Sequence, residues 1–480
     1  MIVHEDVLQR AVDLALELGA SYAEARYHRL ASSSITTRYG DVISYGERLS
    51  EGIGVRVLVD GALGFSATNS LDWEHAREAV EEAVKLARAH ARLMKSRIEF
   101  AEARVGRAKY EAVSLKPFDS MSLEDKASLL IDVWKSVGEA VRECKVMTLM
   151  CSFNESVEEK TVINSDGAYV VSKVPRLSVS YNFVLLHPQR GTIQRRFSYG
   201  ASGGLELLDE WRVAEEASEE AAKLERVLVE GVEPPREPVD VVVGSEVVGL
   251  IVHESCGHPS EADRILGREA AQAGMSFIKP GMLGARIGSE HATVIDDPTV
   301  PRSYGFYLYD DEGVPARPRY LYREGVINEH LHNRWTASVF KVESNAAARA
   351  MDYNSEPIIR MANTYLKPGD YSFEELIEDV ELGVYIRSYM EWNIDDVRWG
   401  QRYVGLEAYM IEGGELGKPV RNPVLEITTK GFYSRIDAVG KELRFYPGTC
   451  GKGEPAQGVP VWFGGPDVRL RRVTLGVVAR

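Results

Sequence analysis

Apolar residues recur with helical spacing in four segments of the first half of the chain. From Asp6 to Leu18 they follow each other at intervals of three and four, and Gly19 provides a stop signal. The same spacing recurs in the segments that begin at Leu71, Ser122 and Trp211. Each segment therefore predicts an amphipathic helix, with the last one ending near residue 229.

Strand patterns lie between these helices. Residues 33–68 and 146–199 are rich in β-branched side chains and are punctuated by turn signals, including "NSDG" at Asn164–Gly167. The order helix, antiparallel strands, helix thus occurs twice, as an internal duplication would produce. The first half is expected to be α+β.

The pattern changes after the proline-rich segment "GVEPPREPVD" at 231–240. Short strands then dominate, with hairpin turns predicted at "YDDEGVP", "YREGVIN", "KPGD" and "IEGGELGKP". We therefore expect three domains: N-terminal α+β at 1–112, middle α+β at 113–232, and a C-terminal domain at 233–480. The last is expected to be mainly antiparallel β and to carry one important helix.

Composition and charge restrict the class of protein. The chain has 480 residues, of which 44% are hydrophobic and 27% charged, and its formal net charge is −15. This charge disfavours nucleic acid or an anionic membrane as the main partner, and the basic run "RGTIQRR" at 190–196 is interpreted as a solvated hairpin. The N-terminus lacks a signal-peptide pattern and no apolar run approaches the roughly 18 residues of a membrane helix, so a cytoplasmic protein is expected.

The candidate chemistry lies in "HESCGH", residues 253–258. A strand "VDVVVG" precedes it, and Ser245 is the expected N-cap of the helix that carries it. His253 and His258 are five residues apart, which separates two side chains by roughly 140° around a regular helix. Both can face one ion only if the helix bulges or unwinds near Gly257 and Pro259, as these residue types favour.

Two imidazoles leave a catalytic zinc site one protein ligand short. The best remaining candidate is Cys450, in a glycine-rich turn, and Glu254 is placed to act as general base. Cys256 is expected to be a small buried residue. His330 and His332, in "NEHLHNR", are interpreted as surface hairpin residues, although their spacing also suits a pair of ligands. A rival mechanism uses Cys450 as a nucleophile with a histidine as base.

Six blocks of the sequence resemble the TldD branch of the TldD/PmbA family, metalloproteases first described as modulators of DNA gyrase. The resemblance is dense from about residue 240 to 475 and thinner over the N-terminal half. The blocks are "HESCGH", "GMLGARIGSEHATVIDD", "YLYDDEGVPARP", "IIRMANTYLKPGD", "GLEAYMIEGGELGKPVRNP" and "CGKGEPAQGVPV".

The resemblance implies a zinc site, with one zinc per chain held by His253, His258 and Cys450, and Glu254 as general base. It also implies a homodimer, or a heterodimer with a PmbA/TldE-like paralogue, which encloses the site and admits peptides or unfolded segments. The turn "GKGEPAQG" after Cys450 is longer than the family's compact pattern. The alternative is a peptide-binding adaptor with a structural zinc, which requires a fourth protein ligand such as Cys256 or a carboxylate.

Overall fold

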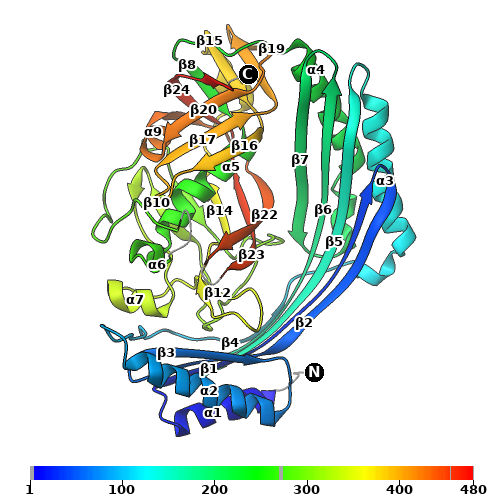
Figure 1. Cartoon of the computed structure of the whole chain (residues 1–480). Helices are drawn as coiled ribbons and strands as arrows, with labels where there is room; N and C mark the ends of the chain where they lie inside the picture. Colours follow the sequence, from blue (N-terminus) through cyan, green and yellow to red (C-terminus); the bar gives the residue numbers. More distant parts are fainter. Residues whose placement is uncertain (1–4, 270–273, 454–455, 479–480) are drawn as a thin grey trace.

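One sheet of seven strands runs through the N-terminal half of the protein (Figure 1). The computed structural model describes residues 5–269, 274–453 and 456–478. The strand order is β3-β2-β1-β5-β6-β4, with β7 beside β6, and all pairs are antiparallel except β4–β6. The strands are β1 (Tyr22–Arg38), β2 (Asp41–Val59), β3 (Ala62–Thr68), β4 (Arg107–Glu111), β5 (Lys145–Asn164), β6 (Tyr169–His187) and β7 (Gly191–Ser202).

Two pairs of helices cover the two ends of this sheet. They are α1 (Glu5–Glu17), α2 (Trp73–Ala91), α3 (Leu123–Ala140) and α4 (Val213–Glu230), close to the four segments predicted from helical spacing. One core lies between α1, α2 and the strands β1 and β2, and a second lies between α3, α4 and β5–β7. In β5, alternate residues Leu149, Cys151 and Phe153 are buried in the second core, as the two-residue period of a strand requires.

The sheet joins segments that the sequence assigned to two domains. β1, from residues 1–112, pairs with β5, from residues 113–232, over fifteen successive positions from Glu24–Asn164 to Arg38–Met150. The three-domain division stays a prediction. The expected α+β class, with helices and antiparallel strands in the first half, is confirmed.

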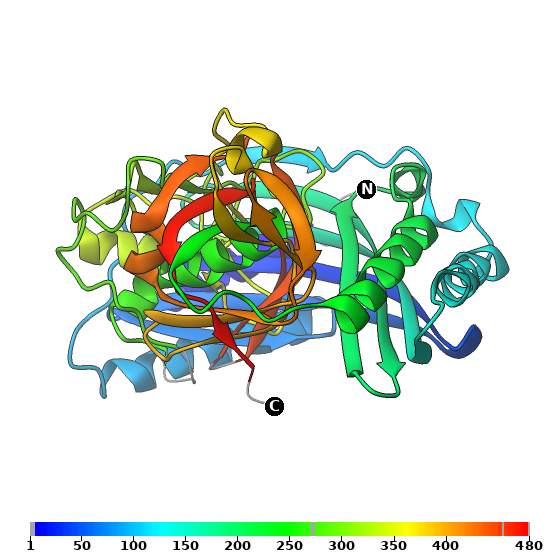
Figure 2. The same ribbon diagram turned by 90° about the horizontal axis from the view of Figure 1, so that it is seen from above.

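The C-terminal half is built from several smaller sheets on the opposite side of the long strands from α3 and α4 (Figure 2). It is mainly antiparallel, as expected, but β8–β15 and β14–β23 are parallel pairs. Its strands are β8 (Val239–Val243), β9 (Val294–Asp296), β10 (Arg319–Arg323), β11 (Val326–Ile327), β12 (Ala348–Arg349), β13 (Ile358–Ile359), β14 (Asn363–Leu366), β15 (Leu382–Ile386), β16 (Tyr389–Ile394), β17 (Gly400–Gly405), β18 (Ala408–Glu412), β19 (Glu415–Pro419), β20 (Pro423–Thr428), β21 (Ile436–Val439), β22 (Arg444–Lys452), β23 (Gln457–Gly465), β24 (Val468–Val473) and β25 (Gly476–Val477).

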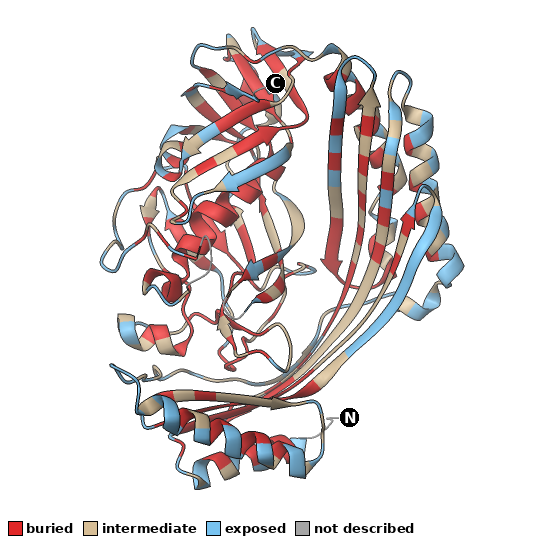
Figure 3. Ribbon diagram, in the orientation of Figure 1, coloured by how far each residue is buried: buried red, intermediate tan, exposed pale blue. Residues whose placement is uncertain are grey.

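A helix buried along its whole length, α5 (Ser245–Val252), lies at the centre of this half (Figure 3). The other helices are short: α6 (Ala262–Ile265), α7 (Arg334–Phe340), α8 (Phe373–Ile377) and α9 (Thr429–Arg435). Hairpins form at the predicted turns "YREGVIN", between β10 and β11, and "IEGGELGKP", between β18 and β19. The segment "KPGD" instead leads from β14 towards α8, so that hairpin prediction is wrong.

Buried ion pairs hold the two halves together. Arg56 of β2 lies 2.8 Å from Glu312, and Arg195 of β7 lies 2.8 Å from Glu246 of α5. The interpretation of residues 190–196 as a solvated hairpin is therefore wrong at Arg195, which is only 2% exposed. Its charge is offset by carboxylates from distant parts of the chain, and the run of basic residues by itself does not show that such partners exist.

His330 and His332 are also buried, which contradicts their interpretation as surface hairpin residues. In the described part of the chain this segment forms an isolated bridge, between Leu331 and Glu261, instead of a hairpin strand. Both rings pack against Phe340 of α7. Burial lowers the pKa of His330 to about 4 and that of His332 to about 3, so both rings are neutral at physiological pH.

Candidate metal centre

The helix that carries the "HESCGH" motif changes its winding at the first histidine. α5 follows β8 directly and ends at Val252, and residues His253–Gly257 then form a π-helical turn. The backbone N–H of His258 donates to the carbonyl of His253, five residues earlier. Residues five apart therefore lie on the same side of the helix, and the expected bulge near Gly257 is present.

The start of α5 differs by one residue from the expectation. Gly244, not Ser245, is the N-cap, and Ser245 is the first helical residue. The carboxylate of Asp467 accepts a 2.7 Å hydrogen bond from the Ser245 backbone N–H. An acidic side chain from β23–β24 thus takes the role assigned to the serine.

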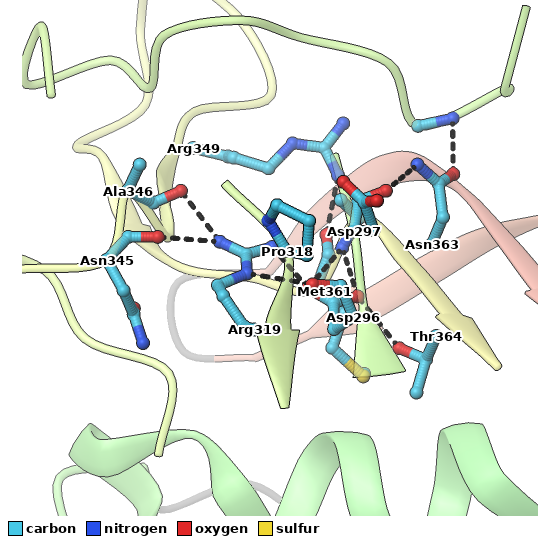
Figure 4. Close-up of polar contacts among 12 residues, drawn as sticks. Asp296, Asp297, Pro318, Arg319, Asn345, Ala346, Arg349, Met361, Asn363 and Thr364 are labelled. Atoms are coloured by element: carbon cyan, nitrogen blue, oxygen red, sulfur yellow. Dashed lines mark hydrogen bonds and ion pairs between the residues drawn. The ribbon is translucent and has the colours of Figure 1, made fainter. Parts of the chain in front are cut away.

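Close packing at Gly257 holds the π-helical turn in place. A Cβ atom at Gly257 would lie 2.0 Å from the sulfur of Met361, so only glycine fits there without displacing that side chain. The segment after Met361 is fixed by Asp296, which accepts hydrogen bonds from the Ala362 backbone at 3.0 Å and the Thr364 hydroxyl at 2.9 Å (Figure 4).

A buried ion pair in turn holds Asp296. The guanidinium of Arg319 contacts its carboxylate, and both side chains are 0% exposed. Arg319 also donates to the carbonyl of Ala346 at 2.8 Å (Figure 4). Protein groups satisfy the charge of each partner, and the network supports the segment that packs against Gly257.

The structure brings His253, His258 and Cys450 together. One ligand atom from each lies within 4.8 Å of the others. The Nε2 atom of His258 is 3.4 Å from the Cys450 sulfur, and the two imidazole rings are 4.9 Å apart, centroid to centroid. All three residues are at most 5% exposed. Cys450 comes from β22, and Arg360 donates to its backbone carbonyl.

A buried carboxylate orients His258. The Nδ1 atom of this ring lies 3.0 Å from Glu261, which also contacts Arg264 and lies 3.4 Å from Lys452. Burial raises the pKa of Glu261, but Lys452 and Arg264 outweigh that effect and hold it well below the usual value. The ionised carboxylate accepts a hydrogen bond from Nδ1–H, which leaves Nε2 directed at Cys450.

The side chains of Cys450 and His253 are in environments that suit a metal ion. Burial raises the pKa of the Cys450 thiol, but His258 and Arg360 outweigh burial and lower it to about 7. Burial lowers the pKa of His253, and its Nδ1 atom has no hydrogen-bond partner in the described part of the chain. One thiol and two imidazole side chains form a donor set that fits tetrahedral zinc with one open position.

Glu254 lies beside this cluster and is 6% exposed. Its Oε2 atom accepts a hydrogen bond from Arg398, in the turn between β16 and β17. Burial raises the pKa of Glu254, but His258 and Arg398 outweigh burial and lower it. Arg398 is held by its left-handed backbone, with φ of 63°, and by a 2.8 Å hydrogen bond from the Thr429 hydroxyl to its carbonyl.

Some candidate residues lie outside the cluster, and sequence reasoning missed others. Cys256 is fully buried in the hydrophobic core, as expected. His330 and His332 do not belong to the cluster of donor atoms found among the described residues. Glu261 and Arg398 were not identified. The spacing of three residues between His258 and Glu261 is a local signal for the first, whereas nothing in the sequence near residue 398 points to the second.

Profiles of three domains match the chain in order. Domain 1 of the PmbA/TldA metallopeptidases matches residues 23–87, the central domain matches 116–225, and the C-terminal domain matches 236–477. The chain belongs to the TldD/PmbA family. The resemblance found in the sequence is thus confirmed. The longer turn expected after Cys450 includes residues 454–455, which lie outside the described residues.

Relatives in this family match nearly the whole chain. A metalloprotease of Methanocaldococcus jannaschii is 30% identical over 95% of this chain and 97% of its own length. A protein of Saccharolobus solfataricus named zinc metalloprotease TldD homolog is 26% identical over 96% of this chain and 98% of its own.

Solved structures share the fold. A Thermotoga maritima protein described as a modulator of a DNA gyrase superposes with a TM-score of 0.77 at 19% identity, covering 98% of this chain and all of that one. TldE from Thermococcus kodakarensis superposes with a TM-score of 0.74 at 18% identity, over 98% of this chain and all of that one. In this TldD/PmbA protein, no helix of the described residues is long and apolar enough to cross a membrane.

Proposed function

We propose that this protein is a zinc-dependent peptidase in which His253, His258 and Cys450 hold one zinc per chain. The observation that carries the proposal is the π-helical turn, which aligns two histidines five residues apart beside a cysteine from β22. Three protein ligands leave a fourth position for water or substrate, as catalytic zinc requires. The names of the relatives support the same activity.

Bound zinc would polarise the peptide carbonyl and lower the pKa of a water molecule. Glu254 is the residue that takes the proton from the attacking water and delivers it to the leaving amine. One of its oxygens, Oε2, accepts a hydrogen bond from Arg398. Burial raises the pKa of Glu254, but His258 and Arg398 outweigh burial, so the carboxylate is ionised and able to accept a proton.

A thiol hydrolase is the second candidate, because one observation favours it. Cys450 lies 3.4 Å from His258, and its lowered pKa of about 7 is that of a reactive thiol. This mechanism predicts peptide cleavage that survives removal of zinc by a chelator. The zinc mechanism predicts that chelation abolishes cleavage and that added zinc restores it.

Zinc content per chain, measured by elemental mass spectrometry, tests the ligand set. We expect about one zinc in the wild type and in Glu254→Gln, and a large loss in His258→Ala and Cys450→Ala. Cys144→Ala is the matched control, because this cysteine is partly exposed and lies outside the cluster. Full zinc retention in Cys450→Ala would exclude the proposed ligands, and peptide cleavage by Glu254→Gln would exclude the proposed base.

We further propose that the substrates are peptides or unfolded segments admitted to a cavity enclosed by a dimer. The partner is a second copy or a PmbA/TldE-like chain, which the likeness to TldE supports. Within the described chain, the outer edge of β2 is unpaired before Ile53, and Val42, Ile43, Tyr45 and Leu49 on it are about half exposed. Such an edge favours association. We expect Ile43→Lys to shift the mass measured by light scattering towards the monomer.

The adaptor alternative requires a closed zinc site. In the described residues the cluster consists of three donors, and Cys256 is not one of them. An open fourth position favours catalysis over a structural role. Peptide binding without cleavage by the zinc-loaded wild type would support the adaptor.

A further inference from the structure

A cavity lies between the N-terminal sheet and the C-terminal half, and the residues of the proposed metal centre do not line it. Its volume is about 580 Å³. β7 forms one wall, and the first turn of α5 with strands β22 and β23 forms the other. Aromatic side chains line it on both sides, among them Tyr199, Trp211, Tyr446 and Trp462.

Three elements connect this cavity to the metal centre. α5 places Glu246 in the cavity wall and His253 at the metal centre seven residues later, about 10 Å further along the helix. β22 contributes Tyr446 to the cavity and Cys450 to the cluster. The ring of Phe463 in β23 lies 6.2 Å from the His253 ring and 6.0 Å from the Tyr446 ring. A distance of about 10 Å is spanned by about three residues of an extended peptide.

The cavity wall carries more negative than positive charge. Six carboxylates and four arginines line it. Arg195 is shared between Glu220 at 2.7 Å and Glu246 at 2.8 Å, so one guanidinium offsets two carboxylates. Glu216 and Asp467 form no ion pair with any described residue, and their contacts are hydroxyl groups and a backbone N–H.

The carboxyl groups of the wall differ in their pKa shifts. Burial raises the pKa of Glu220, but Arg195 outweighs burial and lowers it. Burial raises the pKa of Glu246, and Glu220 and Glu407 raise it further despite the adjacent Arg195. Burial also raises the pKa of Asp467. A cation that enters the cavity would relieve the repulsion among these carboxylates.

The aromatic walls favour the same kind of ligand. The faces of aromatic rings attract guanidinium and ammonium groups, and the Arg195 guanidinium already lies 4.8 Å from the centre of the Phe197 ring. An anionic ligand would meet the surplus of carboxylates, because Arg195 and Arg387 are already paired with glutamates. The surplus of carboxylates and the aromatic rings therefore both favour a cationic ligand.

We propose that this cavity is a subsite for an arginine or lysine side chain of the peptide substrate, about three residues from the bond that is cleaved. Its direct contacts are expected to be the carboxylate of Glu216 and the rings of Trp211 and Tyr446. The inference rests on the proposed peptidase function, and it adds a preference for basic peptides.

The first experiment uses the full-length, zinc-loaded protein and a set of alanine-rich peptides in which one arginine is moved along the chain. We expect kcat/KM to be highest when the arginine lies about three residues from the cleaved bond, and about tenfold lower when glutamine replaces that arginine. Glu216→Gln should remove most of this arginine preference. Glu219→Gln is the matched control, because this residue lies on the same helix, pairs with Arg212 and does not line the cavity.

Equal cleavage of the arginine and glutamine peptides, or an unchanged preference in Glu216→Gln, would overturn the subsite. Binding separates this outcome from failure of the proposed function. Fluorescence anisotropy of the labelled arginine peptide with the Glu254→Gln protein should show binding that Glu216→Gln weakens about tenfold. If no peptide is cleaved but this dependence on Glu216 remains, the peptidase proposal fails and the subsite stands. If the arginine and glutamine peptides bind equally, the subsite fails.

Discussion

Replacement of Glu261 by glutamine tests how the protein tunes its metal centre. The substitution keeps the size of the side chain but removes its charge. The His258 ring, 3.0 Å away, then loses a charged acceptor at Nδ1, and Nε2 becomes a weaker ligand. Changes of this kind reduce metal affinity by about 10- to 100-fold, which corresponds to about 1.4–2.7 kcal/mol.

The substitution should weaken the fold only moderately, because the neighbouring cations keep other partners. Arg264 remains 3.0 Å from Glu269, and Lys452 remains 2.8 Å from Asp263. We therefore expect Glu261→Gln to destabilise the fold by about 1–3 kcal/mol, the range for losing one charged hydrogen bond. Circular dichroism should show an unchanged secondary structure.

Competition with a chromogenic chelator measures the zinc dissociation constant directly. Glu246→Gln is the matched control, because it also removes a buried carboxylate bound to an arginine but lies at the other end of α5. We expect its zinc affinity to equal that of the wild type. A dissociation constant for Glu261→Gln within twofold of the wild type, or an equal loss in Glu246→Gln, would refute the role assigned to Glu261.

Three further predictions address the turn, the base and the buried histidines. Gly257→Ala places a Cβ atom 2.0 Å from the Met361 sulfur. It should destabilise the fold by about 1–3 kcal/mol in urea unfolding and reduce zinc content. The control Gly138→Ala, in open space on α3, should not destabilise the fold. Arg398→Ala should lower kcat/KM by about 10- to 100-fold at unchanged zinc content, and Arg398→Lys should recover part of it. The pKa of His330 is about 4 in the folded protein, which is below its value in the unfolded chain, so acid favours unfolding. Between pH 6 and 4.5 this group should lower the free energy of unfolding by about 1.4 kcal/mol per pH unit.

Each of these predictions has an outcome that contradicts it. Normal zinc content and stability in Gly257→Ala would show that the turn does not depend on close packing at this position. Loss of zinc from Arg398→Ala would assign Arg398 to the integrity of the site instead of to Glu254. A His330→Leu variant with the same pH dependence as the wild type in urea unfolding would mean that this ring is not the group that titrates.

Much of the fold follows from local pattern. The helices α1 to α4 were predicted from apolar spacing, because an amphipathic helix repeats its buried face every three to four residues whatever it packs against. The break in α5 was also predictable, since a five-residue gap between candidate ligands requires a bulge and glycine permits one. The candidate ligands came from the motif and from the family resemblance.

Burial and charge pairing were decided by the tertiary structure. Arg398 contacts Glu254, which lies 144 residues earlier in the chain. Arg195 contacts Glu246, which lies 51 residues later, and this buried carboxylate offsets its charge. The prediction for His330 and His332 was wrong for the same reason, because the sequence of a short polar segment does not show which distant residues bury it. The sequence by itself determined the period of each long helix and the residue types able to bind a metal. Only the folded chain decided which charges meet, because electrostatic pairing depends on distance in space and not on distance along the chain.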